Sequence, residues 1–266
     1  MSDQLIVAGF HRSGTSLACQ LLQRAGLFLG YDLLGSKFSN LHGHFEDVEI
    51  LNLHEHILAD NGQTWLVDEP FLPVITRHHW QSMRQIVRRR DAEHDLWGFK
   101  DPRVCSFMML WKHHLPNAKV LLVYRHFSDS TYSLAQRQSI ELFSDPGAPQ
   151  RLYRRFWEAP DLALRMWLTH NDALLAFART YPEDTLAMSS NMIQNGFPVV
   201  RAINQRWGLG LEEVSVSEVF DPIVAHRRPG KQPVSDRRLI ERIDATWRAL
   251  EQLGAQTERM TEEATV

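Results

Sequence analysis

The chain has 266 residues, of which 44% are hydrophobic, so it can bury one large core and lies near the upper size limit of a single domain. A formal charge of −3 argues against the overall positive field that nucleic-acid binding requires, so any anion site must be built locally. The two cysteines are too few for a disulfide framework and lie in apolar segments, where a free thiol is usually buried. We expect one domain over residues 1–266 and no nucleic-acid partner.

The N-terminal sequence MSDQLIVAGF lacks the basic start and long apolar stretch of a secretory signal. No later stretch approaches the roughly eighteen uncharged apolar residues of a membrane-spanning helix. The sequence therefore predicts a soluble cytoplasmic protein without a transmembrane segment.

The first predicted unit is a strand, a loop and a helix. Residues 4–9 form a short β-branched run, and leucines recur at helical spacing over residues 15–25 before Gly26, a residue type that commonly ends a helix. Two more helices are predicted over residues 48–58 and 80–90, where apolar side chains share one face.

Strands and helices then alternate along the chain. LWGFK at 96–100 and AKVLLVYR at 118–125 predict buried strands, each followed by a helical run. The later predicted segments are a turn-rich loop at 144–150, a helix at 151–180, a strand at 184–189 and helices at 198–208 and 237–253. This alternation indicates the α/β class, with a mostly parallel central sheet flanked by helices and a ligand site at the carboxyl ends of the strands.

The loop after the first strand has the pattern of a phosphate-binding loop. GFHRSGTS at residues 9–16 has the glycine spacing of GxxxxGK[ST] and lies between a strand and a helix, as such a loop must. Backbone N–H groups and the positive end of the helix form a concave anion site there. Thr15 stands where a kinase or ATPase needs lysine, and the cation of the loop is Arg12, two residues before Gly14.

This loop resembles the 5′-phosphosulfate-binding loop of the sulfotransferases that use 3′-phosphoadenosine-5′-phosphosulfate (PAPS), and the resemblance covers most of residues 5–138. It implies a P-loop-like sulfotransferase fold, PAPS as sulfuryl donor, adenosine 3′,5′-bisphosphate as product and no metal. The loop residues that it implies in cofactor binding are His11, Arg12, Ser13, Gly14, Thr15 and Ser16.

A second family motif binds the 3′-phosphate through an arginine at a strand end and a serine eight residues later. Arg125 and Ser133 stand at that spacing, and a guanidinium with a helix hydroxyl suits phosphate oxygens. The basic segment HRRPGK at 226–231 lies where cytosolic members of the family close over the nucleotide. We therefore expect cofactor contacts from Arg227, Arg228 and Lys231, with a solvated loop as the alternative.

KDPR at residues 100–103 ends the second predicted strand and resembles an element of carbohydrate-type and many bacterial sulfotransferases. This resemblance implies that Lys100 or Arg103 neutralises charge on the substrate or bridging oxygen, while Asp101 orients one of them. The alternative is a turn in which Asp101 and Arg103 form a structural ion pair.

In-line sulfuryl transfer to a hydroxyl needs a group that accepts the hydroxyl proton. NLHGHFED at 40–47 resembles the N-x-x-G-x-x-E element of many sulfotransferases and makes Glu46 the predicted base, with Asp47, His42 and His44 as alternatives. Glu46 could instead be an acid that complements a helix dipole. The thirteen histidines form no HExxH and the cysteines no CxxC, so we expect no metal.

Together these residues predict a sulfotransferase that moves the sulfuryl group of PAPS to a hydroxyl of a sugar, lipid or small-metabolite acceptor. The predicted catalytic residues are Glu46, Lys100 and Arg12. A P-loop kinase, which would depend on ATP and magnesium, and a nucleotide-binding protein without turnover are the alternatives. The acceptor pocket is expected to form from loops at 31–46, 62–80 and 139–160, whose composition does not identify the acceptor.

Overall fold

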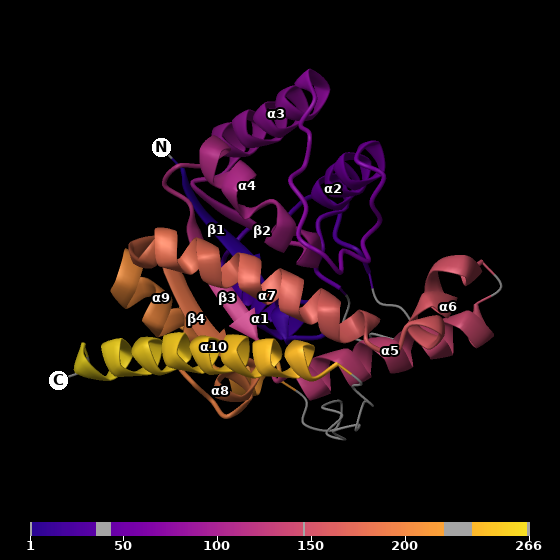
Figure 1. Ribbon diagram of the computed structural model, residues 1–266. Helices are drawn as coiled ribbons and strands as arrows, with labels where there is room; N and C mark the ends of the chain where they lie inside the picture. The colour runs from indigo at the N-terminus through magenta and orange to yellow at the C-terminus, as the bar shows by residue number, and fades with distance from the viewer. Residues whose placement is uncertain (1, 36–43, 146, 221–235, 265–266) are drawn as a thin grey trace.

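The computed structural model describes residues 2–35, 44–145, 147–220 and 236–264, and within these ranges its centre is a four-stranded sheet (Figure 1). The strands are β1 (Asp3–Ala8), β2 (Leu96–Lys100), β3 (Lys119–Tyr124) and β4 (Thr185–Ser189). Their order is β2-β1-β3-β4, and each neighbouring pair is parallel. β1 is therefore central, with Ile6 beside Phe99 of β2 and Val120 of β3.

Helices cover both faces of this sheet (Figure 1). They are α1 (Thr15–Arg24), α2 (Val48–Asp60), α3 (Arg77–Glu93), α4 (Met108–His114), α5 (Phe127–Ser144), α6 (Gln150–Glu158), α7 (Leu162–Thr180), α8 (Ser190–Gln194), α9 (Val199–Trp207) and α10 (Arg237–Glu263). The described ranges also contain three short 3₁₀ turns, η1 (Pro102–Ser106), η2 (Pro182–Asp184) and η3 (Val216–Glu218). The predicted α/β class with a parallel central sheet flanked by helices is confirmed.

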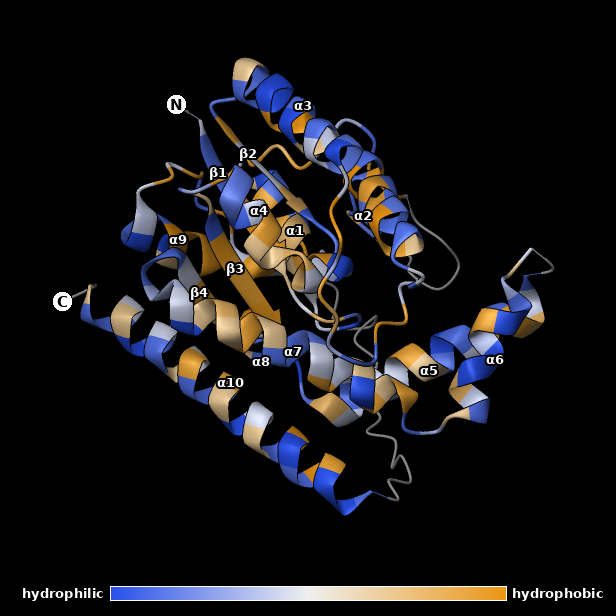
Figure 2. Ribbon diagram, turned by 45° about the horizontal axis from the view of Figure 1, so that its top comes forward, coloured by the Kyte–Doolittle hydropathy of each residue, from blue (hydrophilic) through white to orange (hydrophobic). Residues whose placement is uncertain are grey.

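Alternate side chains of the strands enter two separate cores, because successive residues of a strand point to opposite faces. Ile6 of β1 packs in the core that includes α2, α4, α7 and α10, whereas Leu5 packs in the core that includes α1 and α9. Burial on both faces explains the continuous apolar runs LIVA in β1 and VLLVY in β3. Figure 2 shows apolar strands enclosed by helices with hydrophilic outer sides.

The structure divides the helix predicted over residues 151–180 into α6 and α7. Pro160 lies in the short gap between them. Proline has no N–H to donate and disfavours helical backbone at the residue before it, so the chain turns there. Apolar spacing alone continued across the break, which is why the sequence predicted a single helix.

The last helix, α10, continues to Glu263 and is longer than the helix predicted over residues 237–253. Its buried stripe runs on through Gly254, Thr257 and Thr261, which are small or polar residues that apolar periodicity does not detect. The hydroxyl of Thr257 accepts a hydrogen bond of 3.2 Å from the backbone N–H of Ala187 in β4. This contact fixes the C-terminal part of α10 against the edge strand.

Cys19 and Cys105 are free and buried, as their apolar surroundings in the sequence predict. Burial raises the pKa of the Cys19 thiol to about 12 and also raises that of Cys105. Neither thiol is therefore a nucleophile at neutral pH. No helix in the described ranges is long and apolar enough to cross a membrane.

Candidate active site

The predicted phosphate loop connects β1 to α1 at the carboxyl edge of the sheet. Gly9 has no room for a side chain, because a Cβ there would run into the carbonyl oxygen of Val123 in β3. Gly14 has a φ of 89°, and a Cβ there would lie 2.8 Å from the hydroxyl oxygen of Ser190. Gly9 is thus needed for the close approach of β3, and Gly14 for the tight turn before α1 begins at Thr15, where the first N–H groups of the helix lack helical partners.

The hydroxyl groups of the loop have different surroundings. Ser13 is fully buried and its hydroxyl has no hydrogen-bond partner in the described part of the chain. Thr15 is also buried. The Ser16 hydroxyl donates a hydrogen bond of 3.2 Å to the carbonyl oxygen of His44, which joins the loop to the segment before α2.

The two predicted anion-binding segments contact each other directly. The Nε of Arg12 donates to the hydroxyl of Ser133 in α5 over 3.0 Å. The Nη1 of Arg125, which follows β3, donates to the backbone carbonyl of Arg12 over 3.3 Å. Residues more than a hundred positions apart in the sequence therefore form one site at the ends of β1 and β3.

This site is rich in positive charge. The pKa of Arg12 is lowered to about 10, chiefly by burial and also by the nearby Arg137 and Arg125, while Glu141 acts in the opposite direction. Burial also lowers the pKa of Arg125, although Asp129 lies 3.8 Å from its Nε and opposes the shift. Crowded, partly buried guanidinium groups of this kind gain free energy when an anion binds between them.

Sequence reasoning missed Arg137, which lies one helical turn beyond Ser133 on the same side of α5. Its Nε donates to Glu141 over 2.8 Å, and its Nη2 lies 3.3 Å from the Nε2 of His44. The four-residue spacing from Ser133 was the available signal. Arg137 therefore connects α5, which carries Ser133, to the segment that carries Glu46.

Lys100 and Glu46, predicted separately as catalytic residues, form a buried ion pair. The Nζ of Lys100 donates to Oε1 of Glu46 over 2.9 Å and to the carbonyl oxygen of His44 over 2.8 Å. Lys100 is 3% exposed and Glu46 is 8% exposed. Since His44 also accepts a hydrogen bond from Ser16, the pair is tied to the phosphate loop.

The backbone is in an unfavourable conformation at Arg12 and at Phe45, the residue before Glu46. Arg12 has a φ of 63° and Phe45 has a φ of 54°, and no other non-glycine residue of the described ranges has a positive φ. The left-handed conformation costs roughly 1–2 kcal/mol for a residue with a side chain. Strain of this kind is concentrated at functional sites, so its position here points to the same residues as the sequence motifs.

The alternative bases are placed differently. Oδ1 of Asp47 caps α2 by accepting from the N–H of Glu49 over 2.9 Å, and Oδ2 lies 2.5 Å from the fully buried Arg90. Burial raises the pKa of Asp47, against the effect of Arg90. Asp47 therefore serves the fold. His42 lies outside the described residues.

The predicted cofactor-binding residues of the C-terminal basic loop, Arg227, Arg228 and Lys231, also lie outside the described residues.

In KDPR, Asp101 orients Arg103 and not Lys100. Oδ1 of Asp101 accepts from Nη1 of Arg103 over 2.8 Å, and its Oδ2 lies 2.6 Å from Nδ1 of His54. Trp111 donates to Nε2 of His54 over 2.7 Å. Because indole only donates, His54 must carry its proton on Nδ1 and donate it to Asp101. Burial acts to raise the pKa of Asp101, but Arg103 and His54 hold it well below its usual range.

A group of buried nitrogen atoms lies beside this ion pair. Nε2 of His11, Nε2 of His170 and Nε of Arg103 are buried and have no hydrogen-bond partner among the described residues. The ring of His11 lies 5.1 Å from that of Trp65 and 5.9 Å from that of His170. Burial holds the pKa of His11 well below its usual range and lowers that of His170 to about 4. Both imidazoles are therefore neutral at pH 7.

The described part of the chain contains no group of three or more histidine, cysteine, aspartate or glutamate side chains that could hold a metal ion.

No protein-family model matches the sequence, and no curated protein matches it at a significant level. Among solved structures, the chain is similar to sulfotransferase STF1 from Mycobacterium tuberculosis H37Rv, with 11% identity and a TM-score of 0.44, over 98% of this chain and 76% of that one. It is also similar to a retinol dehydratase in complex with androsterone and the inactive cofactor PAP, with 13% identity and a TM-score of 0.37, over 98% and 80% of the two chains. At TM-scores below 0.5 these similarities carry no weight for function, which depends on the residues of the site.

Proposed function

We propose that this protein is a sulfotransferase that transfers the sulfuryl group of PAPS to a hydroxyl group of an acceptor. The observation that carries the proposal is the direct contact of the two cationic segments, with Arg12 bound to Ser133 and Arg125 bound to the backbone of Arg12. PAPS carries a 5′-phosphosulfate and a separate 3′-phosphate, and two adjoining cationic segments suit these two groups. Thr15 replaces the lysine that would bind a polyphosphate, which argues against a kinase.

The residues present fit such a donor. Gly9 and Gly14 let the loop pack closely against Val123 and Ser190, and the buried Ser13 hydroxyl lacks a partner among the described residues. When bound, PAPS would supply the sulfuryl group on a good leaving group, adenosine 3′,5′-bisphosphate. Arg12 and the N–H groups of the loop would hold the 5′-phosphosulfate, and Arg125 with Ser133 the 3′-phosphate. Arg227, Arg228 and Lys231 stay candidates for further contacts with the nucleotide.

Glu46 is the proposed general base. Its Oε1 is held by Lys100, while its Oε2 accepts no hydrogen bond from any described residue and can accept the proton of the acceptor hydroxyl. As that proton leaves, the acceptor oxygen forms a bond to sulfur. The bond from sulfur to the bridging oxygen of the 5′-phosphate breaks, and its electron pair stays on that oxygen.

Lys100 and Arg12 are proposed to stabilise this developing charge. An ammonium group has three N–H donors, and two of those of Lys100 bind Glu46 and the carbonyl of His44. The third is proposed to donate to the bridging or transferring oxygen. A cation held in place before the reaction stabilises the transition state without reorganising. The resemblance of KDPR to carbohydrate-type enzymes favours an alcohol or sugar acceptor over a phenol.

The proposal is tested by calorimetric titration with adenosine 3′,5′-bisphosphate in the absence of metal. We expect tight binding that Arg12→Ala and Arg125→Ala each weaken by roughly tenfold or more, because each removes charge-assisted hydrogen bonds. Arg77→Ala is the matched control, since this arginine is exposed at the start of α3. Preference for ATP with magnesium would instead support a kinase. Binding without sulfuryl transfer to any acceptor in a screen would support a nucleotide-binding protein.

A further inference from the structure

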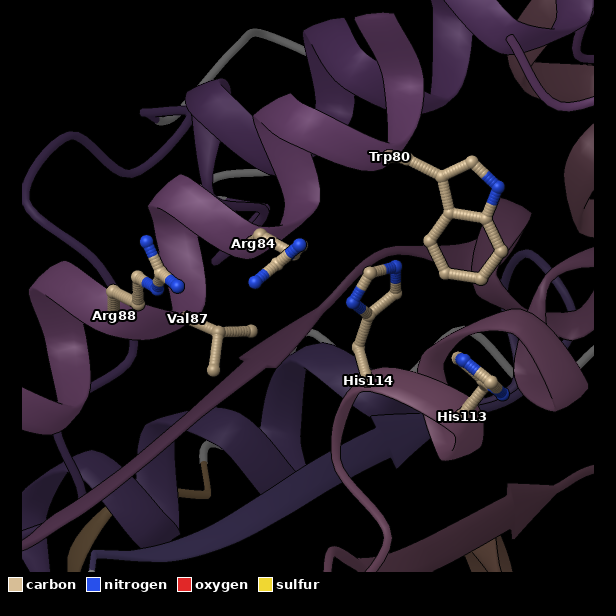
Figure 3. Close-up of a pocket in the computed structure, with 6 residues that line it drawn as sticks. All are labelled: Trp80, Arg84, Val87, Arg88, His113 and His114. Carbon is tan, nitrogen blue, oxygen red and sulfur yellow. The ribbon is translucent and has the colours of Figure 1, made fainter. Parts of the chain in front are cut away.

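A cavity lies between α3 and α4, away from the candidate active site (Figure 3). Its volume is about 430 Å³, and it is lined by Trp80, Arg84, Val87 and Arg88 of α3 and by His113 and His114 of α4. This size lies within the range of roughly 300–1,000 Å³ that is typical of small-molecule sites. α4 ends at His114, shortly before β3 begins, so the cavity lies toward the amino-terminal edge of the sheet (Figure 1). The phosphate loop lies at the opposite edge.

The lining of this cavity contains basic side chains and no acidic one. Arg84 and Arg88 are exposed, and no carboxylate of the described ranges forms an ion pair with either. Their neighbours on the same helix differ, because Arg89 lies 2.5 Å from Glu49 and Arg90 lies 2.5 Å from Asp47. In a protein with a net charge of −3, two uncompensated guanidinium groups at one cavity form a local positive site.

His114 adds an unpartnered ring nitrogen to the cavity. Its Nε2 is buried and has no hydrogen-bond partner in the part of the chain that the structure describes. Burial lowers the pKa of His114 to about 4, and His113 and Arg84 act in the same direction. The imidazole of His114 is thus neutral at pH 7, and its buried Nε2 is left for a ligand to bind.

Trp80 and Val87 give the cavity an apolar side. The indole ring of Trp80 lies 4.4 Å from the ring of His114 and 5.0 Å from that of His113, measured between centroids. Figure 3 shows these rings at one end of the cavity and the two guanidinium groups toward the other. A ligand that combines an anionic group with a planar or apolar group would match both ends.

We infer that this cavity is a second anion site, which binds the phosphate or sulfate group of a small organic ester through Arg84 and Arg88 and packs the organic part against Trp80. Guanidinium groups bind the oxygens of such esters through paired hydrogen bonds. The inference does not depend on the proposed sulfotransferase activity, since none of these side chains belongs to the candidate active site.

Calorimetric titration with phenyl phosphate, phenyl sulfate and inorganic phosphate tests this inference. The titration is made on the wild type and repeated on the Arg12→Ala variant, in which anion binding at the phosphate loop is weakened. We expect phenyl phosphate or phenyl sulfate to bind in both cases, and the tighter of the two identifies the ester. The double variant R84Q/R88Q should weaken this binding by about tenfold or more.

Two controls distinguish a specific binding site from a general effect of positive charge on the helix. Arg77→Gln removes the same charge from the same helix outside the cavity and should change the affinity by less than about twofold. Trp80→Leu should weaken phenyl phosphate more than inorganic phosphate. The inference is wrong if neither ester binds in either background, or if R84Q/R88Q binds as tightly as the wild type. Should the double variant not fold, the His114 ring resonances of the wild type must shift when phenyl phosphate is added.

Discussion

Arg12 donates a hydrogen bond from its Nε to the hydroxyl of Ser133 over 3.0 Å. The cation of the phosphate loop is therefore positioned by the helix that follows β3, and the first and second anion-binding segments are mechanically linked. Arg12 needs this support, because its own backbone has a φ of 63°. A side chain on a strained loop is useful for binding only when its neighbours fix its direction.

The first prediction concerns this link. We expect Ser133→Ala to weaken the binding of adenosine 3′,5′-bisphosphate by about tenfold, because Arg12 loses a partner and the 3′-phosphate loses a donor. Ser133→Thr keeps the hydroxyl and should retain most of the affinity. Ser144→Ala, at the exposed end of the same helix, is the control. Calorimetry measures all three, and equal affinities for Ser133→Ala and wild type would contradict a role for Ser133.

The second prediction concerns the buried pair of Lys100 and Glu46. Glu46→Gln keeps an oxygen for Lys100 but cannot accept a proton at neutral pH, so we expect transfer to fall by roughly 10²–10⁴-fold. Nucleotide affinity should change little. Transfer is measured with an acceptor found by screening or, failing one, as slow transfer of the sulfuryl group to water.

Glu262→Gln is the matched control for this substitution, because Glu262 is exposed near the end of α10. It should keep full transfer activity. Loss of nucleotide binding together with transfer in Glu46→Gln would mean that Glu46 supports the loop structurally and is not the base.

The third prediction concerns His170. Its folded-state pKa of about 4 lies below the ordinary value of 6.5, so the unfolded chain binds a proton between these pH values and the folded chain does not. Stability must therefore fall as the pH is lowered from 6.5 toward 4, by up to about 1.4 kcal/mol for each pH unit. We expect this dependence to be shallower in His170→Phe. Denaturant unfolding at several pH values measures it.

His78 provides the control for this pH dependence, since it is an exposed histidine at the start of α3. His78→Phe should retain the dependence on pH of the wild type. In addition, the ring resonances of His170 should not titrate between about pH 5.5 and 8. A midpoint near 6.5 in that titration would contradict the buried neutral imidazole.

The sequence predicted the parts of the site but not all of their contacts. The sequence identified three motifs of the site, GFHRSGTS, KDPR and the Arg125–Ser133 spacing, because each lies at the end of a buried apolar strand. Parallel strands bring their carboxyl ends together, so these motifs were expected to meet. The pairing of Lys100 with Glu46 was not predicted, because the two residues lie 54 positions apart and the backbone of Phe45, beside Glu46, is left-handed. No composition rule predicts that conformation for phenylalanine.

The missed features of the fold have similar causes. The apolar spacing continues from α6 into α7 and predicts one helix, but the proline between them interrupts the helical backbone. The end of α10 was missed because Thr257 and Thr261 are buried through hydrogen bonds along the helix and to β4, and not through apolar contact. Arg137 was missed because its role depends on a contact with His44, from a different part of the chain.

The last prediction separates two effects of a side chain at Gly14: the strain of its left-handed backbone and the steric clash with Ser190. Gly14 and Gly26 have similar backbone angles, with φ of 89° and 98°, but a Cβ at Gly14 would meet Ser190, whereas a Cβ at Gly26 would meet nothing within 4 Å. Both Gly14→Ala and Gly26→Ala should lose roughly 1–2 kcal/mol of unfolding free energy through strain. Only Gly14→Ala should also displace the loop and weaken nucleotide binding. Denaturant unfolding and calorimetry on the two variants measure these effects. Restored binding in the double variant Gly14→Ala with Ser190→Gly would show that the collision, and not the strain, controls the anion site.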